Sequence, residues 1–139
     1  MEIEVNYLAI ILASVASLII GSVWYSKVAF GEAWMQMVGL TKVTAKAKMV
    51  PAVVTMFLLS LVMGYILSHV TYMSMSVLGY PAQVAGLSSA FMMWGGFVVP
   101  TILGTGLFEQ RRKKLLLINL GNWLVTLLAM GAVIGYFGF

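Results

Sequence analysis

Four long apolar runs, separated by short connections, constrain this chain more than any other feature. Each run has about the 20 residues that a helix needs to cross the hydrocarbon core of a bilayer. Apolar residues make up 62% of the 139 residues, more than a water-soluble domain of this size can bury. We therefore expect an all-α polytopic membrane protein that forms one domain over residues 1–139. Its four transmembrane helices, arranged as two hairpins, are expected at residues 5–25, 49–71, 84–108 and 115–136.

The positive charges predict how these helices are oriented. All eight Lys and Arg residues lie in the loops at residues 26–48 and 109–114. Because Lys and Arg are enriched in cytoplasmic loops, we expect both loops in the cytoplasm and both termini on the opposite side. The formal charge of +4 is thus assigned to the membrane surface, and the lipid bilayer, not nucleic acid, is the expected partner. Glu2 and Glu4 make the start acidic, unlike a secretory signal peptide, so the first helix is expected to be retained.

An aromatic boundary follows the first run. Trp24 is expected to anchor the inner interface, where amphipathic aromatic rings are enriched. Phe30, Trp34 and Val38 follow at four-residue spacing, which predicts a short amphipathic helix along the membrane surface that ends at Gly39. Trp24, Phe30 and Trp34 are therefore the expected interface anchors.

The third run contains residues that disturb a helix. Gly95 and Gly96 are followed by Pro100, which removes one backbone hydrogen bond and crowds the carbonyl four residues earlier. We expect a kink near Gly96. Residues 71–83, which precede this run, contain Gly79-Tyr80-Pro81 and are expected to form an uncharged connection.

Small residues at four-residue spacing predict faces for close helix packing. They occur in the first run as Ala9, Ala13, Ser17 and Gly21, and in the fourth run as Gly131 and Gly135. The leading functional hypothesis is a structural or interaction protein that uses these faces to self-associate or to dock to a membrane partner.

Polar residues at the inner end of the bundle suggest a second function. Asn119 and Asn122 share a helical face and must find hydrogen-bond partners in lipid. They either fix the bundle or form an inner polar pocket with Tyr25, Ser26 and Glu109. The pocket favours a small carrier or channel for a neutral or weakly charged solute. The runs hold no ionisable residue at mid-depth, so a proton-coupled exchanger built on a central carboxylate is disfavoured.

Catalytic and metal sites have little basis in this composition. With one His, no Asp and no Cys, the chain cannot build a Ser-His-Asp triad or a conventional hydrolytic metal site, so neither enzyme activity nor a cofactor is expected. His69, Met73 and Met75 offer imidazole and thioether ligands of the kind that suit Cu(I). Because that set holds one strong ligand, we expect no metal.

Several short motifs recur together along the chain. They are Asn6-Tyr7, Gly21, Trp24-Tyr25-Ser26, Phe30-Gly31, Trp34, Gly39, Phe108-Glu109 and Ile118-Asn119. In this combination the chain resembles the small membrane proteins of domain of unknown function 1761 over essentially its whole length. Lys27 departs from the pattern, which has a proline after Trp-Tyr-Ser. The resemblance implies a four-helix integral membrane protein and brings no activity, substrate or cofactor.

Overall fold

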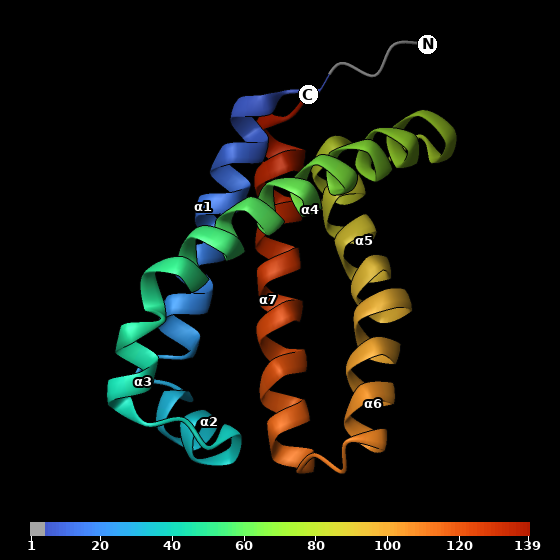
Figure 1. Ribbon diagram of the computed structural model, residues 1–139. Coiled ribbons are helices and arrows are strands. Elements are labelled where there is room, and N and C mark those ends of the chain that lie inside the picture. Colours follow the sequence, from blue (N-terminus) through green and yellow to red (C-terminus); the bar gives the residue numbers. More distant parts are fainter. Residues whose placement is uncertain (1–4) are drawn as a thin grey trace.

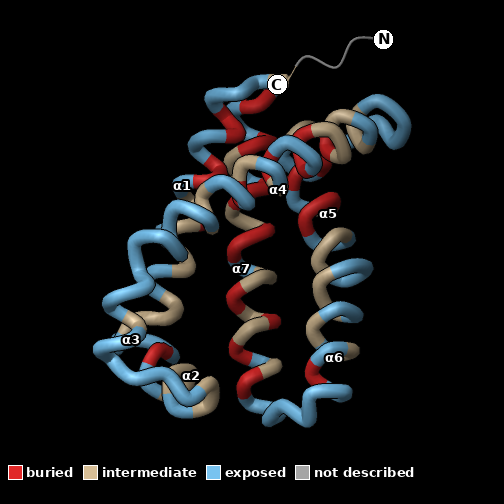
Figure 2. The backbone as a smooth tube through the Cα atoms, viewed as in Figure 1, coloured by how far each residue is buried: buried red, intermediate tan, exposed pale blue. Residues whose placement is uncertain are grey.

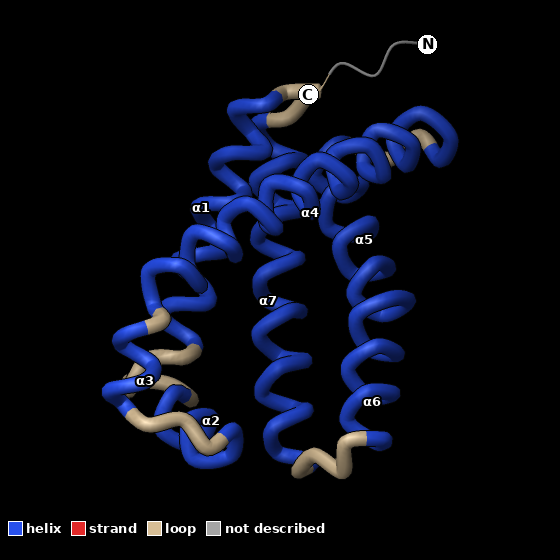
Figure 3. The backbone as a smooth tube through the Cα atoms, in the orientation of Figure 1, coloured by secondary structure: helices blue, strands red, loops and turns tan. Residues whose placement is uncertain are grey.

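The computed structural model describes residues 5–139, and this range is a bundle of helices joined by short turns (Figure 1, Figure 3). Glu2 and Glu4, which bear on the signal-peptide expectation, lie outside the described residues. The helices are α1 (Tyr7–Trp24), α2 (Gly31–Val38), α3 (Lys42–Ala47), α4 (Met49–Leu78), α5 (Ala82–Met93), the π-helix η1 (Trp94–Val98), α6 (Val99–Phe108) and α7 (Lys113–Phe137).

Four helical segments are long and apolar enough to cross a membrane. They are α1, α4, the continuous segment Ala82–Phe108 made of α5, η1 and α6, and α7. The prediction of an all-α chain with four membrane-length helices is confirmed. In Figure 1, α4 crosses α1 and α7 diagonally, and the two ends of the described chain lie together, opposite α2, α3 and the α6–α7 turn.

Asn6 links the first long helix to the last one. Its side-chain oxygen accepts hydrogen bonds from the backbone N–H groups of Leu8 and Ala9, at 3.1 and 3.2 Å, and so caps the start of α1. Its side-chain amide donates to the carbonyl of Phe137 at 2.9 Å. One residue therefore starts the first long helix and ties it to the end of the last one.

The predicted connection over residues 71–83 is wrong in its first half. No glycine or proline interrupts the chain between Thr71 and Leu78, and α4 continues to Leu78. It ends at Gly79, which adopts the left-handed conformation (φ 67°) that glycine reaches without a steric penalty. The connection to α5 is thus shorter than the composition suggests.

The segment between α1 and α4 contains two short helices. The first, α2, ends at Val38 because Gly39 adopts a positive φ of 71°. The second, α3, is not among the predicted elements. Thr41 caps it by accepting a hydrogen bond from the Thr44 N–H at 3.2 Å.

A π-helical turn interrupts the third long helix where the kink is expected. The turn, η1, contains Gly95 and Gly96 and lies just before Pro100. Because Pro100 cannot donate a backbone hydrogen bond and its ring crowds the preceding turn, the helix widens there.

The core lies around α7, which is buried along most of its length (Figure 2). Glycine contacts are closest between α5 and α7. A Cβ atom on Gly86 would lie within 3.0 Å of the Gly131 carbonyl oxygen, and one on Gly131 would crowd Gly86 and Ala90. Gly135 likewise lies against α5. The buried apolar cluster consists of Ala13, Leu67, Ala90, Leu127, Met130 and Ile134.

The small-residue face of α1 is buried in part. Ala9, Ala13 and Ser17 are buried inside the bundle, and the Ser17 and Ser60 hydroxyl oxygens lie 3.0 Å apart across α1 and α4. Gly21 has no neighbouring atom within 4 Å of where its Cβ would stand. Close packing on this face therefore ends one turn before Gly21.

Candidate binding groove

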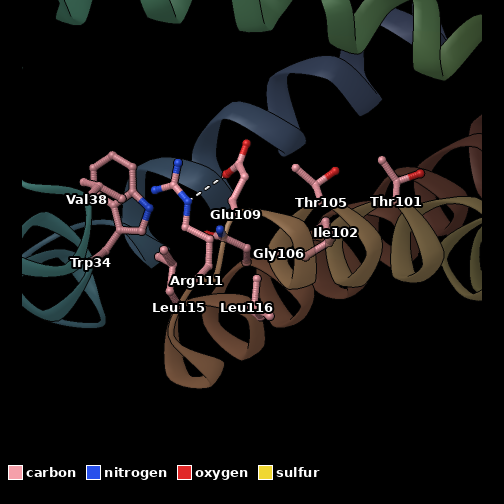
Figure 4. Close-up of a pocket in the computed structure, with 11 residues that line it drawn as sticks. Trp34, Val38, Thr101, Ile102, Thr105, Gly106, Glu109, Arg111, Leu115 and Leu116 are labelled. Carbon is pink, nitrogen blue, oxygen red and sulfur yellow. Dashed lines mark hydrogen bonds and ion pairs between the residues drawn. The ribbon is translucent and has the colours of Figure 1, made fainter.

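An open groove of about 370 Å³ lies at the end of the bundle that carries the basic loops. One group of side chains comes from α2, a second from α6 and the turn after it, and a third from the first turns of α7. Figure 4 shows Trp34 and Val38 on one side, Thr101 and Thr105 on the other, and the pair of Glu109 and Arg111 between them. The lining residues are Trp34, Val38, Thr101, Ile102, Thr105, Gly106, Glu109, Arg111, Leu115, Leu116 and Asn119.

Asn119 is held in position from outside the groove. The Tyr25 hydroxyl donates a hydrogen bond of 2.9 Å to Asn119 Oδ1. The Tyr25 ring packs against Trp34, with ring centroids 5.1 Å apart. Tyr25 follows the last residue of α1, and burial raises its pKa to about 12, so the phenol stays protonated and remains a donor. Among the described residues, the Asn119 side-chain N–H groups are left available to a ligand.

Two tryptophans clamp α7 on either side of Asn119. The Trp24 Nε1–H donates to the Ile118 carbonyl, and the Trp94 Nε1–H donates to the Leu120 carbonyl, both at 3.0 Å. Gly121 leaves room for the Trp24 ring, because a Cβ there would lie 2.9 Å from the ring carbon Cζ2. The expected interface anchor Trp24 thus packs against α7, and Phe30 packs on it with ring centroids 4.9 Å apart.

The mouth of the groove carries an ion pair. Arg111 Nε donates to Glu109 Oε2 at 2.8 Å, and the two side chains are 45% and 48% exposed. Such an exposed pair contributes little to stability, typically about 0–1 kcal/mol. Either partner can therefore exchange this contact for a charged or polar ligand group at small cost.

The structure brings together three of the five residues expected in an inner pocket. Glu109 and Asn119 line the groove, and Tyr25 holds Asn119 from behind. Ser26 lies elsewhere, because its hydroxyl donates to the Val23 carbonyl at 2.7 Å and its carbonyl accepts from Ala29 and Gly31 within the turn after α1.

Asn122 is not among the residues that line the groove, and it is 7% exposed. Its side-chain oxygen and the hydroxyl of Thr126, one turn later, have no hydrogen-bond partner within residues 5–139. Both are buried polar groups of the kind that an internal water satisfies.

Sequence reasoning misses several residues of the groove. Thr101, Thr105 and Glu109 recur at four-residue spacing on one face of α6, a signal that is present in the sequence. Trp34 and Val38 are expected on the membrane surface, but they form one wall of the groove. No linear pattern indicates that α2 packs beside α6 and α7.

The candidate Cu(I) ligands His69, Met73 and Met75 all lie on α4. His69 Nδ1 lies 2.9 Å from the Tyr65 carbonyl, and its ring packs on the Tyr65 ring at 4.3 Å. Met73, one turn later, is half exposed. Within residues 5–139, no group of three His, Cys, Asp or Glu residues is placed to hold a metal ion.

Four membrane-length helices with a groove at one end are the architecture expected of a small multi-pass membrane protein. The chain belongs to the family described as protein of unknown function DUF1761, whose profile matches residues 8–135. It matches none of the curated proteins and none of the solved structures with which it was compared.

Proposed function

We propose that this protein is a multi-pass membrane carrier that binds one ligand molecule in the groove between α2, α6 and α7. The positioned Asn119 amide carries the proposal. Ligand pockets typically combine largely apolar walls with a few fixed polar groups. Here Asn119 is fixed by Tyr25, and the exposed pair of Glu109 and Arg111 lies at the open end.

A docking role for the small-residue faces has less support. Ala9 and Ala13 are 1% and 0% exposed, and Gly131 lies against Gly86 of the same chain. Faces that are filled within one chain are not available to a second copy or to another membrane protein. The groove, in contrast, is open.

The π-helical turn supports movement of α6. Turns of this kind occur often at functional sites, and η1 separates α5, which packs on α7 through glycines, from α6, which borders the groove. At Gly95 and Gly96, no atom beyond the local backbone lies within 4 Å of where a Cβ would stand, so these two glycines are not packed against another helix. Bending at η1 would widen or narrow the groove while α5 stays in place.

The charge distribution supports a cytoplasmic opening of the groove. Arg111 lines the groove, and Arg112, Lys113 and Lys114 follow it directly in the chain. The remaining basic residues lie in the segment from Lys27 to Lys48 that contains α2 and α3. In this orientation α2 lies along the inner membrane surface and each pair of helices turns on the cytoplasmic side. The linked ends at Asn6 and Phe137 then lie on the other side.

Distances across the groove test the carrier directly. The chain has no cysteine, so spin labels can be attached to Gln36→Cys on α2 and Phe108→Cys at the end of α6. In lipid nanodiscs, double electron–electron resonance is expected to give two populations of distances for this pair. A control pair at Val84→Cys and Tyr136→Cys reports on the ends of α5 and α7 and is expected to give one narrow distribution.

The alternative outcome is equally clear. One narrow distribution for both pairs, unchanged by Asn119→Leu, would mean a rigid bundle and would contradict a carrier.

A further inference from the structure

A second cavity lies farther along α7, toward the middle of the bundle. It has about 260 Å³ and an almost wholly apolar surface. It lies between α4, η1 and α7. Its lining residues are Met63, Met93, Phe97, Val98, Trp123 and Leu127.

The residue spacing places the two cavities one after the other along the same pair of helical segments. On the η1–α6 side, the lining residues Phe97, Thr101, Thr105 and Glu109 follow one another at four-residue steps. On the α7 side, Leu127, Trp123, Asn119 and Leu115 do the same. Residues four apart are neighbours on a helix, so the two cavities follow one another along η1–α6 and along α7. We call the two cavities together the long groove.

The long groove has the length of one membrane leaflet. Leu115 and Leu127 are twelve residues apart, which is about 18 Å along a helix. Half of a hydrocarbon core of about 30 Å is about 15 Å. The volumes of about 370 and about 260 Å³ are each at or near the lower end of the range for ligand pockets, roughly 300–1,000 Å³, and together they fall within it.

The polarity of the long groove changes from one end to the other. The deep end is apolar, with Phe97, Trp123 and Leu127. Midway, the Thr101 hydroxyl donates to the Phe97 carbonyl at 2.6 Å and is thus satisfied within its own helix. Asn119 and the ion pair follow at the mouth, where residues 109–114 hold four basic residues against one acidic residue.

We infer that the long groove binds a membrane amphiphile, with its acidic headgroup at the α6–α7 turn and one long chain along η1, α6 and α7 as far as the middle of the bilayer. The inference rests on the proposed carrier function and names the class of its ligand. Arg111 exchanges Glu109 for the headgroup, while Asn119 donates to its ester or hydroxyl oxygens.

Native mass spectrometry in a neutral detergent measures this binding. The probes are phosphatidylglycerol, phosphatidylcholine with the same chains, and glycerol 3-phosphate. The protein is expected to retain one phosphatidylglycerol about tenfold more strongly than phosphatidylcholine, and to show no binding of glycerol 3-phosphate. Thr105→Trp fills the long groove without changing a charge and is expected to lower retention about tenfold.

Two matched controls separate this site from general attraction to basic loops. Leu107→Trp puts the same side chain on the exposed side of α6, and Lys46→Gln removes a charge from α3. Neither should alter retention, whereas Arg111→Gln should reduce the preference for phosphatidylglycerol about tenfold.

Three results are decisive. Equal lipid retention by Thr105→Trp and the unmodified protein would contradict the proposed position of the lipid chain in the long groove. Competition by glycerol 3-phosphate as strong as that of the whole lipid would overturn the amphiphile and leave a carrier of a water-soluble solute. Retained lipid in a protein whose groove distances are single and narrow would overturn the carrier and leave the amphiphile site in place.

Discussion

The two halves of the third long helix meet α7 in opposite ways. At the end near the termini, α5 and α7 approach until backbone touches backbone, with Gly86 facing Gly131. At the other end, α6 borders the groove and many of its side chains are exposed (Figure 2). The third long helix therefore packs tightly on α7 where glycines face each other, and it leaves a groove beside α7 where larger side chains line the space.

The turn η1 lies between these two regions. A π-helical turn changes the direction of a helix, so α6 can diverge from the axis of α5. The difference indicates that α5 holds the third long helix against α7, while α6 forms a border of the groove. The following changes test that division.

Gly131→Leu should have the largest effect. Its side chain would displace Gly86 and Ala90, and overpacking of this kind typically costs about 1–3 kcal/mol or more, the upper end being expected where backbone is in the way. Unfolding in mixed detergent micelles measures the loss. The matched control is Gly104→Leu on α6, where nothing lies within 4 Å and stability should be nearly unchanged. Equal losses in the two variants would refute the contrast between α5 and α6.

Trp94→Phe should have a smaller but clear effect. The variant loses the hydrogen bond from the indole N–H to the Leu120 carbonyl, worth about 1 kcal/mol, together with some packing. We expect lower stability and broader distances across the groove, because α6 loses a link to α7 close to η1. Trp24→Phe, which loses the bond to Ile118, is the comparison variant and should affect α1 instead. Unchanged groove distances in Trp94→Phe would show that the indole does not guide α6.

Tyr25→Phe should change stability by about 0.6 kcal/mol, the average for a hydrogen bond between membrane helices. Its main effect is expected on the groove, because Asn119 is then no longer held and phosphatidylglycerol retention should fall severalfold. Tyr7→Phe, at an exposed position on the same helix, is the control. If both variants retain lipid equally, Asn119 does not depend on Tyr25.

Gly95→Ala combined with Gly96→Ala should change stability in the opposite direction from the preceding variants. Alanine lowers the backbone entropy of the unfolded chain, and no atom lies within 4 Å of the new carbons, so each change should stabilise by about 0.5–1 kcal/mol. The populations of groove distances should narrow, since η1 becomes stiffer. Two undiminished populations would place the hinge elsewhere.

The sequence is sufficient for the long helices and for the position of the bend. Apolar length predicts the membrane-length segments, and Pro100 after two glycines predicts the disturbance at η1. The predicted end of the second long helix at residue 71 is too early. The uncharged segment that follows, with Thr, Ser and Tyr, has the composition of a loop, but the first strong helix stop is Gly79.

The groove is accessible to sequence reasoning only in part. Asn119 and Glu109 can be predicted as site residues because polar groups near lipid need hydrogen-bond or ionic partners. Ser26 and Asn122 are polar too, but neither lines the groove. Ser26 is hydrogen-bonded within the turn after α1, and Asn122 is buried in the bundle. The wall that Trp34 contributes depends on the tertiary path of α2, which periodicity within one helix does not encode.

The diagonal course of α4 makes the protein sensitive to the bilayer itself. With 30 residues, α4 is about 45 Å long, whereas the hydrocarbon core it crosses is about 30 Å thick. A helix with this mismatch must tilt, and a thicker membrane lets it stand more upright at a cost of a fraction of a kcal/mol per Å. Met63 of α4 borders the deep end of the long groove. In the proposed carrier, membrane thickness is therefore expected to act on the same cavity as the ligand.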